Sequence, residues 1–371
     1  MVALHAETGP ETRQSGPVRQ GCCFADSIFA KASNWSCADS PSGAQLSNLC
    51  FWMILMAASN QSATRAETLA KPVETIVHAP GPAGALCGLM LAPAAAHAPV
   101  VLIIPGSGPT DRDGNNSFGI RAATYRLLAE ALAAKGIGSV RIDKRGMFAS
   151  HYAVADGNAV TIADYAADVH AWCATIRQLT GTPCIWLLGH SEGALVALVA
   201  ARDARDICGV VLAAAPGRPV GTILRAQLAA NPANAPLLGQ AFAAIDALES
   251  GRPFDTTGMD PSLMPLFRPQ VQDFLIDAFS YDPAREIAGL SKPVLILQGQ
   301  RDVQIGEADA QRLKDANPNA KLVLLPDANH HLKSVLLDDS ASNRASYADS
   351  VPPLAPDVAD SIVDFINGRK P

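Results

Sequence analysis

The pentapeptide Gly189-His190-Ser191-Glu192-Gly193 constrains the fold more than any other feature, because a buried apolar run precedes it and an apolar stretch with helical spacing follows it. A serine between a strand and a helix occupies a sharp turn, and a glycine two residues to either side removes the Cβ clashes of that turn. The turn presents the serine hydroxyl at the N-terminus of the helix. We therefore predict Ser191 as a nucleophile. The pentapeptide alone is also compatible with an ordinary strand-to-helix turn.

Strands alternate with helices along most of the chain after Glu74. Parallel strands need long crossover connections, so this alternation predicts an α/β fold with a doubly wound, mostly parallel sheet. Helices are expected on both faces of the sheet. The predicted strands are residues 75–78, 85–91, 99–105, 137–142, 183–188, 207–215, 293–297 and 321–325, and the predicted helices are 124–135, 162–179, 194–204 and 240–248.

The alternation stops between Pro216 and Ser291, where the chain is rich in Ala, Pro and Leu and has helical fragments without a strand pattern. An insertion between two strands of such a sheet lies above the carboxyl ends of the strands, where these folds bind ligands. We therefore expect a helical cap insertion over residues 216–291. Four of its apolar residues are expected to set substrate preference more than stability, namely Leu263, Met264, Leu266 and Phe267.

Two loops after later strands carry the partners that a nucleophilic serine needs. Asp302 follows the apolar run PVLILQG, and His330 and His331 follow the run KLVLLP. A serine requires a base that removes its proton and a carboxylate that orients the base, and after this type of turn the chain order is Ser, acid, His. We predict Asp302 as the orienting acid, His330 as the base and His331 as a packed structural residue. Each residue taken singly is also compatible with an ordinary loop position.

Backbone N–H groups near Ser191 are candidates for an oxyanion hole, the group of donors that stabilises negative charge on the substrate oxygen. Glu192 offers an N–H at the start of the predicted helix, and Ser107 offers another in the glycine-rich loop after strand 99–105. The loop around Ser107 is also compatible with a simple tight turn. His190 is expected to be a packed residue of the serine turn. The run Asp143-Lys144-Arg145 is expected to pair with its neighbours and hold the loop after strand 137–142.

Three motifs together resemble the α/β-hydrolase superfamily over about Glu74 to Gly368, in particular a bacterial group of esterases and dienelactone-hydrolase-like or serine-aminopeptidase-like proteins. The resemblance implies an α/β-hydrolase fold and a serine hydrolase that cleaves carboxylic esters through an acyl-enzyme intermediate. The same residues would serve an acyl thioesterase or a peptidase, and a catalytically silent fold that binds a small ligand is the alternative from another class. The three motifs are Pro105-Gly-Ser-Gly-Pro-Thr-Asp-Arg-Asp-Gly114, Asp143-Lys-Arg-Gly146 and Gly189-His-Ser-Glu-Gly193.

The composition limits the other classes of function. With 49% hydrophobic and 17% charged residues, the chain has ample material for a buried core. Its net charge of -6 and 5% aromatic content are unlike those of a nucleic-acid binder. We therefore expect a small-molecule ester as substrate and no nucleic-acid partner, and the oligomeric state stays open. No cofactor is expected, and no metal either, because Asp111, Asp113 and Asn115 alternate as in a calcium loop but lack its closing glutamate.

Residues 1–69 differ from the rest, being rich in Ser, Gln, Asn and Cys. Their apolar stretch, 49–58, is about half the roughly 20 residues that span a bilayer, so no stable membrane span is expected. Its length matches the apolar region of a signal peptide. We therefore expect a leader over 1–69, a hydrolase domain over 70–371, and a periplasmic or secreted protein. The alternative is a disordered leader on a cytoplasmic protein.

Cysteines outside the leader lie in apolar runs and form no C-x-x-C pair. This placement favours small buried thiols, with a disulfide as the second interpretation. The residues concerned are Cys87, Cys173, Cys184 and Cys208.

Overall fold

A computed structural model describes residues 73–92, 97–335 and 340–368. These residues belong to one compact unit. The predicted leader, residues 1–69, with its signal-like stretch, lies outside the described residues. Within the described part, no helix is both long and apolar enough to cross a membrane.

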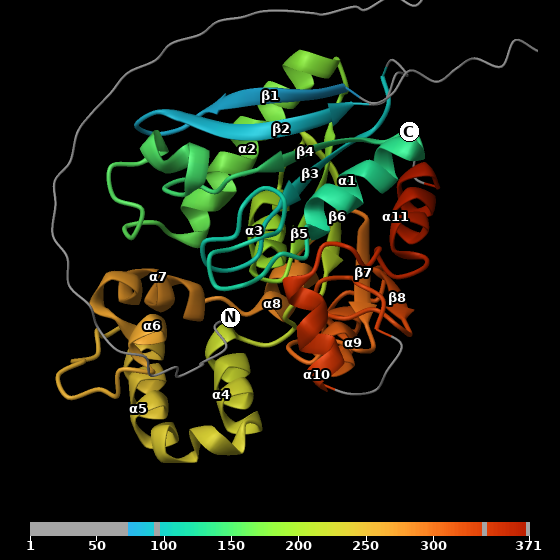
Figure 1. Ribbon diagram of the computed structural model, residues 1–371. Coiled ribbons are helices and arrows are strands. Elements are labelled where there is room, and N and C mark those ends of the chain that lie inside the picture. Colours follow the sequence, from blue (N-terminus) through green and yellow to red (C-terminus); the bar gives the residue numbers. More distant parts are fainter. Residues whose placement is uncertain (1–72, 93–96, 336–339, 369–371) are drawn as a thin grey trace, which may run out of the picture. The chain divides into compact units, whose positions relative to one another are not determined.

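An eight-stranded sheet forms the centre of the described chain, in the order β1-β2-β4-β3-β5-β6-β7-β8 (Figure 1). The pairs β1–β2 and β2–β4 are antiparallel, and every other neighbouring pair is parallel. The predicted mostly parallel sheet is therefore confirmed, with each predicted strand in place. The strands are β1 (Val73–Pro80), β2 (Ala85–Ala92), β3 (Val100–Ile104), β4 (Gly138–Ile142), β5 (Ile185–His190), β6 (Ile207–Ala213), β7 (Val294–Gly299) and β8 (Lys321–Leu325).

Helices cover both faces of the sheet, which explains why its central strands are continuous apolar runs. Along β3, Leu102 and Ile104 face one hydrophobic cluster, whereas Val101 and Ile103 face the other. Helices α2, α3, α8 and α9 contribute to the first cluster, together with Ala278 of the helix α7 (Pro269–Phe279), and α1 and α11 contribute to the second. Their bounds are α1 (Thr124–Ala134), α2 (Ile162–Thr180), α3 (Glu192–Ala201), α8 (Pro283–Ala288), α9 (Glu307–Ala316) and α11 (Val358–Asn367), and α10 (Ser340–Ala345) precedes α11.

The stretch 216–291 contains α4 (Val220–Ala230), α5 (Leu238–Glu249), α6 (Met264–Phe267), α7 (Pro269–Phe279) and α8, and no strand among its described residues (Figure 1). Its helices α4 to α7 share a hydrophobic cluster of their own. Leu263 and Phe267 are fully buried in that cluster. These two residues form part of the core of the insertion, so their substitution should also lower stability, and their effect on substrate preference stays a prediction. Met264 and Leu266 are only partly buried against it.

Helix α9 holds both ends of this insertion. The buried carboxylate of Asp309 accepts hydrogen bonds from the backbone N–H of Gly217 and of Arg218, both at 3.1 Å, and from the Arg218 guanidinium at 2.7 Å. Arg312, one turn later, donates to the Gly217 carbonyl at 2.8 Å and to the Asp282 carboxylate at 3.2 Å. The segment that leaves β6 and the segment that returns before β7 are therefore fixed to the same helix.

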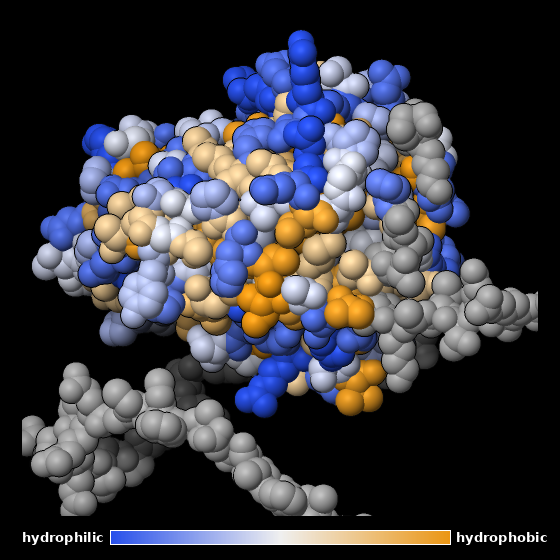
Figure 2. Space-filling model, turned by 90° about the horizontal axis from the view of Figure 1, so that it is seen from above, coloured by the Kyte–Doolittle hydropathy of each residue, from blue (hydrophilic) through white to orange (hydrophobic). Residues whose placement is uncertain are grey.

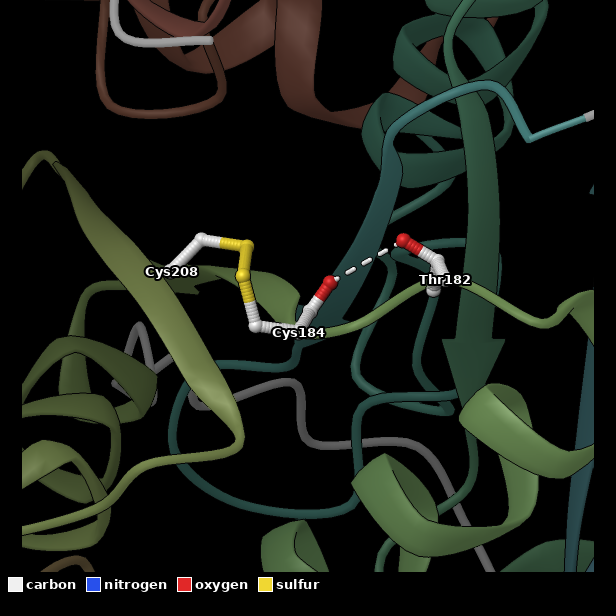
Figure 3. Close-up of a disulfide and its surroundings, with 3 residues drawn as sticks. All are labelled: Thr182, Cys184 and Cys208. Carbon is white, nitrogen blue, oxygen red and sulfur yellow. Dashed lines mark hydrogen bonds between the residues drawn. A yellow bond between two sulfur atoms is a disulfide. The ribbon is translucent and has the colours of Figure 1, made fainter. Parts of the chain in front are cut away.

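A disulfide joins Cys184 to Cys208, which links the residue before β5 to the neighbouring strand β6 (Figure 3). The Thr182 hydroxyl donates a hydrogen bond to the Cys184 carbonyl at 3.3 Å. For this pair the disulfide, our second interpretation, replaces the predicted free thiols. Cys87 and Cys173 are buried free thiols, as predicted.

The face seen in Figure 2 mixes apolar patches with hydrophilic side chains. The edge strand β1 leaves Val73 and Ile76 exposed, at 67% and 62%. Strands β2, β4 and β3 separate β1 from β5 in the sheet order. The exposed edge is therefore several strands away from the serine turn.

Candidate active site

Ser191 occupies a sharp turn between β5 and α3, with φ 54° and ψ −122°. A Cβ on Gly189 would lie 2.2 Å from the Gly193 carbonyl oxygen, and a Cβ on Gly193 would lie 2.4 Å from the Ile104 carbonyl oxygen. Any larger residue would therefore collide with backbone at either position. The strained positive φ of Ser191 is typical of a functional position that the surrounding structure enforces.

His330 and Asp302 are in direct contact at the carboxyl ends of β8 and β7. His330 Nδ1 lies 2.8 Å from Asp302 Oδ2, and the Asp302 side chain is fully buried. Asp302 Oδ1 accepts from the backbone N–H of Gln304 at 2.7 Å and of Ile305 at 2.9 Å, which fixes the carboxylate. When Nδ1 donates to a carboxylate, a neutral imidazole presents Nε2 as its acceptor. His330 is therefore held in the tautomer that a general base requires.

His331 lies in a different environment from His330. Its ring packs edge-on against Tyr347, with centroids 4.4 Å apart. Burial lowers the pKa of His331 well below its ordinary value, so the ring stays neutral. Of the two adjacent histidines, only His330 contacts Asp302.

The loop before α1 and the serine turn lie against each other. A Cβ on Gly106 would lie 3.3 Å from Ser191 Cβ. The next residue, Ser107, and Glu192 at the start of α3 carry the two predicted oxyanion donors. Among the described residues, neither of these two N–H groups donates to a protein acceptor. Both remain available to a substrate oxygen.

Ser191 Oγ makes no hydrogen bond to His330 among the described residues. The serine and histidine loops are instead connected through His190, whose ring centroid lies 4.9 Å from that of His330. Catalytic hydrogen bonds are often long in a ligand-free site and shorten only when substrate binds. The structure therefore brings the acid and base together and places the serine turn beside them.

The model of the alpha/beta hydrolase family matches residues 63–344. The chain belongs to the α/β-hydrolase family. This membership confirms the resemblance inferred from the motifs.

A related curated protein is Esterase EstD of Thermotoga maritima, which is 28% identical over 218 residues, 57% of this chain and 48% of that protein. The matched region thus spans about half the length of this relative. An esterase of Pyrococcus furiosus has 17% identity, a TM-score of 0.49, and coverage of 80% of this chain and 93% of its own. Est1E from Butyrivibrio proteoclasticus has 17% identity and a TM-score of 0.49, covering 79% and 99%.

Asn329, the turn-forming residue before His330, shapes the loop that carries His330 in this α/β-hydrolase. Its side chain is fully buried. Oδ1 accepts from the backbone N–H of His331 and of Lys333, both at 3.0 Å, and Nδ2 donates to the Ser346 hydroxyl at 2.7 Å. An Asn side chain that binds the backbone two residues later is a known turn-forming pattern, so its place just before His330 was a usable signal.

Sequence reasoning missed Tyr125 in α1. The Gly106 N–H donates to the Tyr125 hydroxyl at 3.0 Å, and that hydroxyl lies 2.9 Å from His190 Nδ1. His190 Nε2 lies 2.7 Å from the His330 carbonyl oxygen, which can only accept, so Nε2 carries the proton. Burial lowers the pKa of His190 to about 3, which keeps the ring neutral and leaves Nδ1 to accept from Tyr125. His190 is thus a packed residue of the serine turn, as expected.

The flanking charged residues of this α/β-hydrolase pair with their neighbours. Asp143 binds the Arg112 guanidinium at 2.6 Å. Arg145 makes two hydrogen bonds with the Asp168 carboxylate, both at 2.6 Å. Asp143 and Arg145 therefore hold the loop after β4, as expected.

The calcium-like stretch makes internal contacts. Asp111 Oδ1 accepts from the backbone N–H of Asp113 at 2.9 Å and of Asn115 at 2.8 Å. Within the described residues, no group of three or more His, Cys, Asp or Glu side chains is arranged to hold a metal ion. Asp111 therefore has a local structural role, because its side chain holds the turn.

Proposed function

We propose that this α/β-hydrolase cleaves carboxylic esters through an acyl-enzyme intermediate on Ser191. The observation that carries the proposal is the contact between His330 Nδ1 and the buried Asp302 carboxylate at 2.8 Å, beside the strained serine turn. A base oriented in this way, next to a serine on such a turn, is the arrangement that nucleophilic catalysis needs. The similarity to a protein named an esterase supports an ester as substrate.

In the proposed reaction, Ser191 Oγ attacks the ester carbonyl while His330 Nε2 takes its proton. The N–H groups of Ser107 and Glu192 stabilise the negative oxygen of the tetrahedral intermediate. His330 then gives the proton to the leaving alcohol. Water, activated by the same imidazole, attacks the acyl-enzyme and releases the acid. Asp302 orients His330 and stabilises its charged form throughout.

Ser191→Ala tests the nucleophile. The variant should fold normally and lose about six orders of magnitude in kcat, the loss measured for a serine nucleophile of a serine protease. A fluorophosphonate probe should label the wild-type protein on Ser191 and leave the variant unlabelled. Ser250→Ala, which removes an exposed hydroxyl at the end of α5, is the matched control and should keep full activity. Near-wild-type turnover in folded Ser191→Ala would disprove the role.

The same chemistry serves thioesters and peptides, so the substrate class needs its own test. Purified enzyme should be compared on p-nitrophenyl esters of increasing chain length, acyl-CoA thioesters and aminoacyl amides. We expect the highest kcat/KM on an ester. A higher kcat/KM on a thioester or an amide would instead indicate a thioesterase or a peptidase. Failure of the probe to label Ser191, with no turnover of any substrate, would favour a ligand-binding protein without catalysis.

A further inference from the structure

Lys144 is a buried cation beside the candidate oxyanion hole. Its side chain is 4% exposed, and Nζ donates a hydrogen bond to the Gly106 carbonyl oxygen at 2.7 Å. The sequence suggested only that this residue helps to hold the loop after β4. Burying an ammonium group is costly, so its position needs an explanation beyond loop packing.

The Gly106 carbonyl belongs to the same peptide unit as the Ser107 N–H. A hydrogen bond at the oxygen of a peptide unit polarises the unit and strengthens its N–H as a donor. A charged donor gives a stronger hydrogen bond than a neutral one. The Lys144 ammonium therefore acts on the N–H that we propose as an oxyanion donor, from the opposite end of its peptide unit.

The charge partner of Lys144 belongs to the residue that carries the other proposed oxyanion donor. Glu192 Oε1 lies 3.4 Å from Lys144 Nζ, and the Glu192 backbone N–H is the second oxyanion donor. The Tyr165 ring also faces the ammonium, with 5.3 Å between Nζ and the ring centroid. Lys144 is thus connected to both residues whose N–H groups would hold the oxyanion.

We infer that Lys144 is a positioning residue for the oxyanion hole: it orients and polarises the Gly106–Ser107 peptide and ties it to Glu192. This inference rests on the proposed function. Lys144 does not contact the substrate. Its effect reaches the developing oxyanion through the Ser107 N–H, so it should appear in the transition state and not in substrate binding.

Lys144→Met tests this inference, because it keeps the volume of the side chain and removes its charge and its hydrogen bond. We expect kcat on a p-nitrophenyl ester to fall by about tenfold to a hundredfold, less than or comparable to the loss of a whole oxyanion donor. KM should stay within about twofold. The affinity for a boronic acid, which forms a tetrahedral adduct with the serine, should fall by a similar factor to kcat. A purely structural role would lower the melting temperature and leave both kcat and the boronic acid affinity of the folded variant unchanged.

Two variants complete the design. Lys314→Met is the matched control, because the Lys314 ammonium also donates to two carbonyls, those of Pro318 at 2.8 Å and Ala320 at 2.7 Å, but lies on α9. It should keep wild-type kcat. The double variant Lys144→Met, Glu192→Gln removes both charges, so no buried charge is left without a partner. The double variant should show the same loss of kcat, so it still tests the role of Lys144 if Lys144→Met does not fold.

Wild-type kcat in folded Lys144→Met, or a rise in KM with unchanged boronic acid affinity, would overturn the inference. Fluorophosphonate labelling of the wild-type protein separates this failure from that of the proposed function. Labelling at Ser191 together with unchanged kcat in Lys144→Met rejects only the role of Lys144. Absence of labelling in the wild-type protein rejects the proposed function, and the role of Lys144 with it.

Discussion

His190 Nε2 donates a hydrogen bond to the backbone carbonyl of His330, 2.7 Å away. The residue before the candidate nucleophile therefore holds the backbone of the candidate base. On its other side, His190 accepts from Tyr125, whose hydroxyl accepts from the Gly106 N–H. This buried series of hydrogen bonds thus sets the relative positions of three segments: the turn at Ser191, the loop that carries His330, and the loop that carries Gly106 and Ser107.

Tyr125→Phe removes the middle of this chain and leaves the Gly106 N–H and His190 Nδ1 buried without a partner. We expect a loss of about 1–3 kcal/mol in the free energy of unfolding, the usual cost of unpaired buried polar groups. We also expect a lower kcat, because the loops lose their fixed spacing. Urea unfolding and ester kinetics measure both. Tyr152→Phe removes a hydroxyl from a side chain that is 77% exposed and should change neither value. Unchanged stability in Tyr125→Phe would contradict the proposed role of these hydrogen bonds in holding the loops.

Acid should destabilise the protein through His190. Its folded-state pKa is lowered to about 3, mainly by burial, and an unfolded histidine titrates near 6.5. Below pH 6.5 the unfolded chain therefore binds a proton that the folded protein does not, so stability is lost as the pH falls from 6.5 towards 3. The shift corresponds to a loss on the order of 5 kcal/mol.

The variant His190→Asn isolates this contribution. The free energy of unfolding should fall less steeply between pH 6.5 and 4 in this variant than in the wild-type protein. His151→Asn, at an exposed position, is the control and should follow the wild-type curve. Parallel curves for wild type and His190→Asn would show that His190 titrates normally. Because His331 also has a lowered pKa, the variant should keep part of the acid sensitivity.

The two adjacent histidines should differ in single substitutions. His330→Ala should lower kcat/KM severely, by several orders of magnitude, because it removes the proposed base that contacts Asp302. His331→Ala should act mainly on stability, because its ring packs against Tyr347. Steady-state kinetics on one ester, with thermal unfolding of both variants, provides the comparison. A severe loss in His331→Ala with activity preserved in His330→Ala would reverse the assignment.

The Cys184–Cys208 disulfide makes reduction a test of stability and of compartment. Closing a loop across its sequence separation of 24 residues contributes about 3 kcal/mol in the chain-entropy treatment. Reduction, or the double variant Cys184→Ala, Cys208→Ala, should lower the free energy of unfolding by that order. Intact-mass analysis under non-reducing conditions should find the bond in protein from an oxidising compartment. Protein isolated from its native source with both thiols free would contradict our proposal that it is periplasmic or secreted.

The sequence was sufficient for the sheet and for placing Asp302 and His330 on neighbouring loops at its carboxyl edge. The central strands β3, β5 and β7 are mostly apolar runs, and Asp302 and His330 lie on the loops after β7 and β8, so local patterns carried that information. Tyr125 and Lys144 gave no such signal, because their partners lie 65 and 38 residues away along the chain. Burial of Phe267 was also missed, since an apolar residue in an insertion can face a substrate or its own core.

The insertion has a hydrophobic cluster of its own, but it also places Ala278 of α7 and Ile287 of α8 in the cluster on one face of the sheet. The cluster that α1 and α11 cover contains no residue of the insertion, so the effects of substitutions there and in the insertion's own cluster on the free energy of unfolding should add. Helix α9, through Asp309 and Arg312, fixes where the insertion starts and ends without entering its cluster. The attachment on α9 and the packing of α7 and α8 against the sheet are therefore the points where the sequences of the insertion and of the sheet constrain each other.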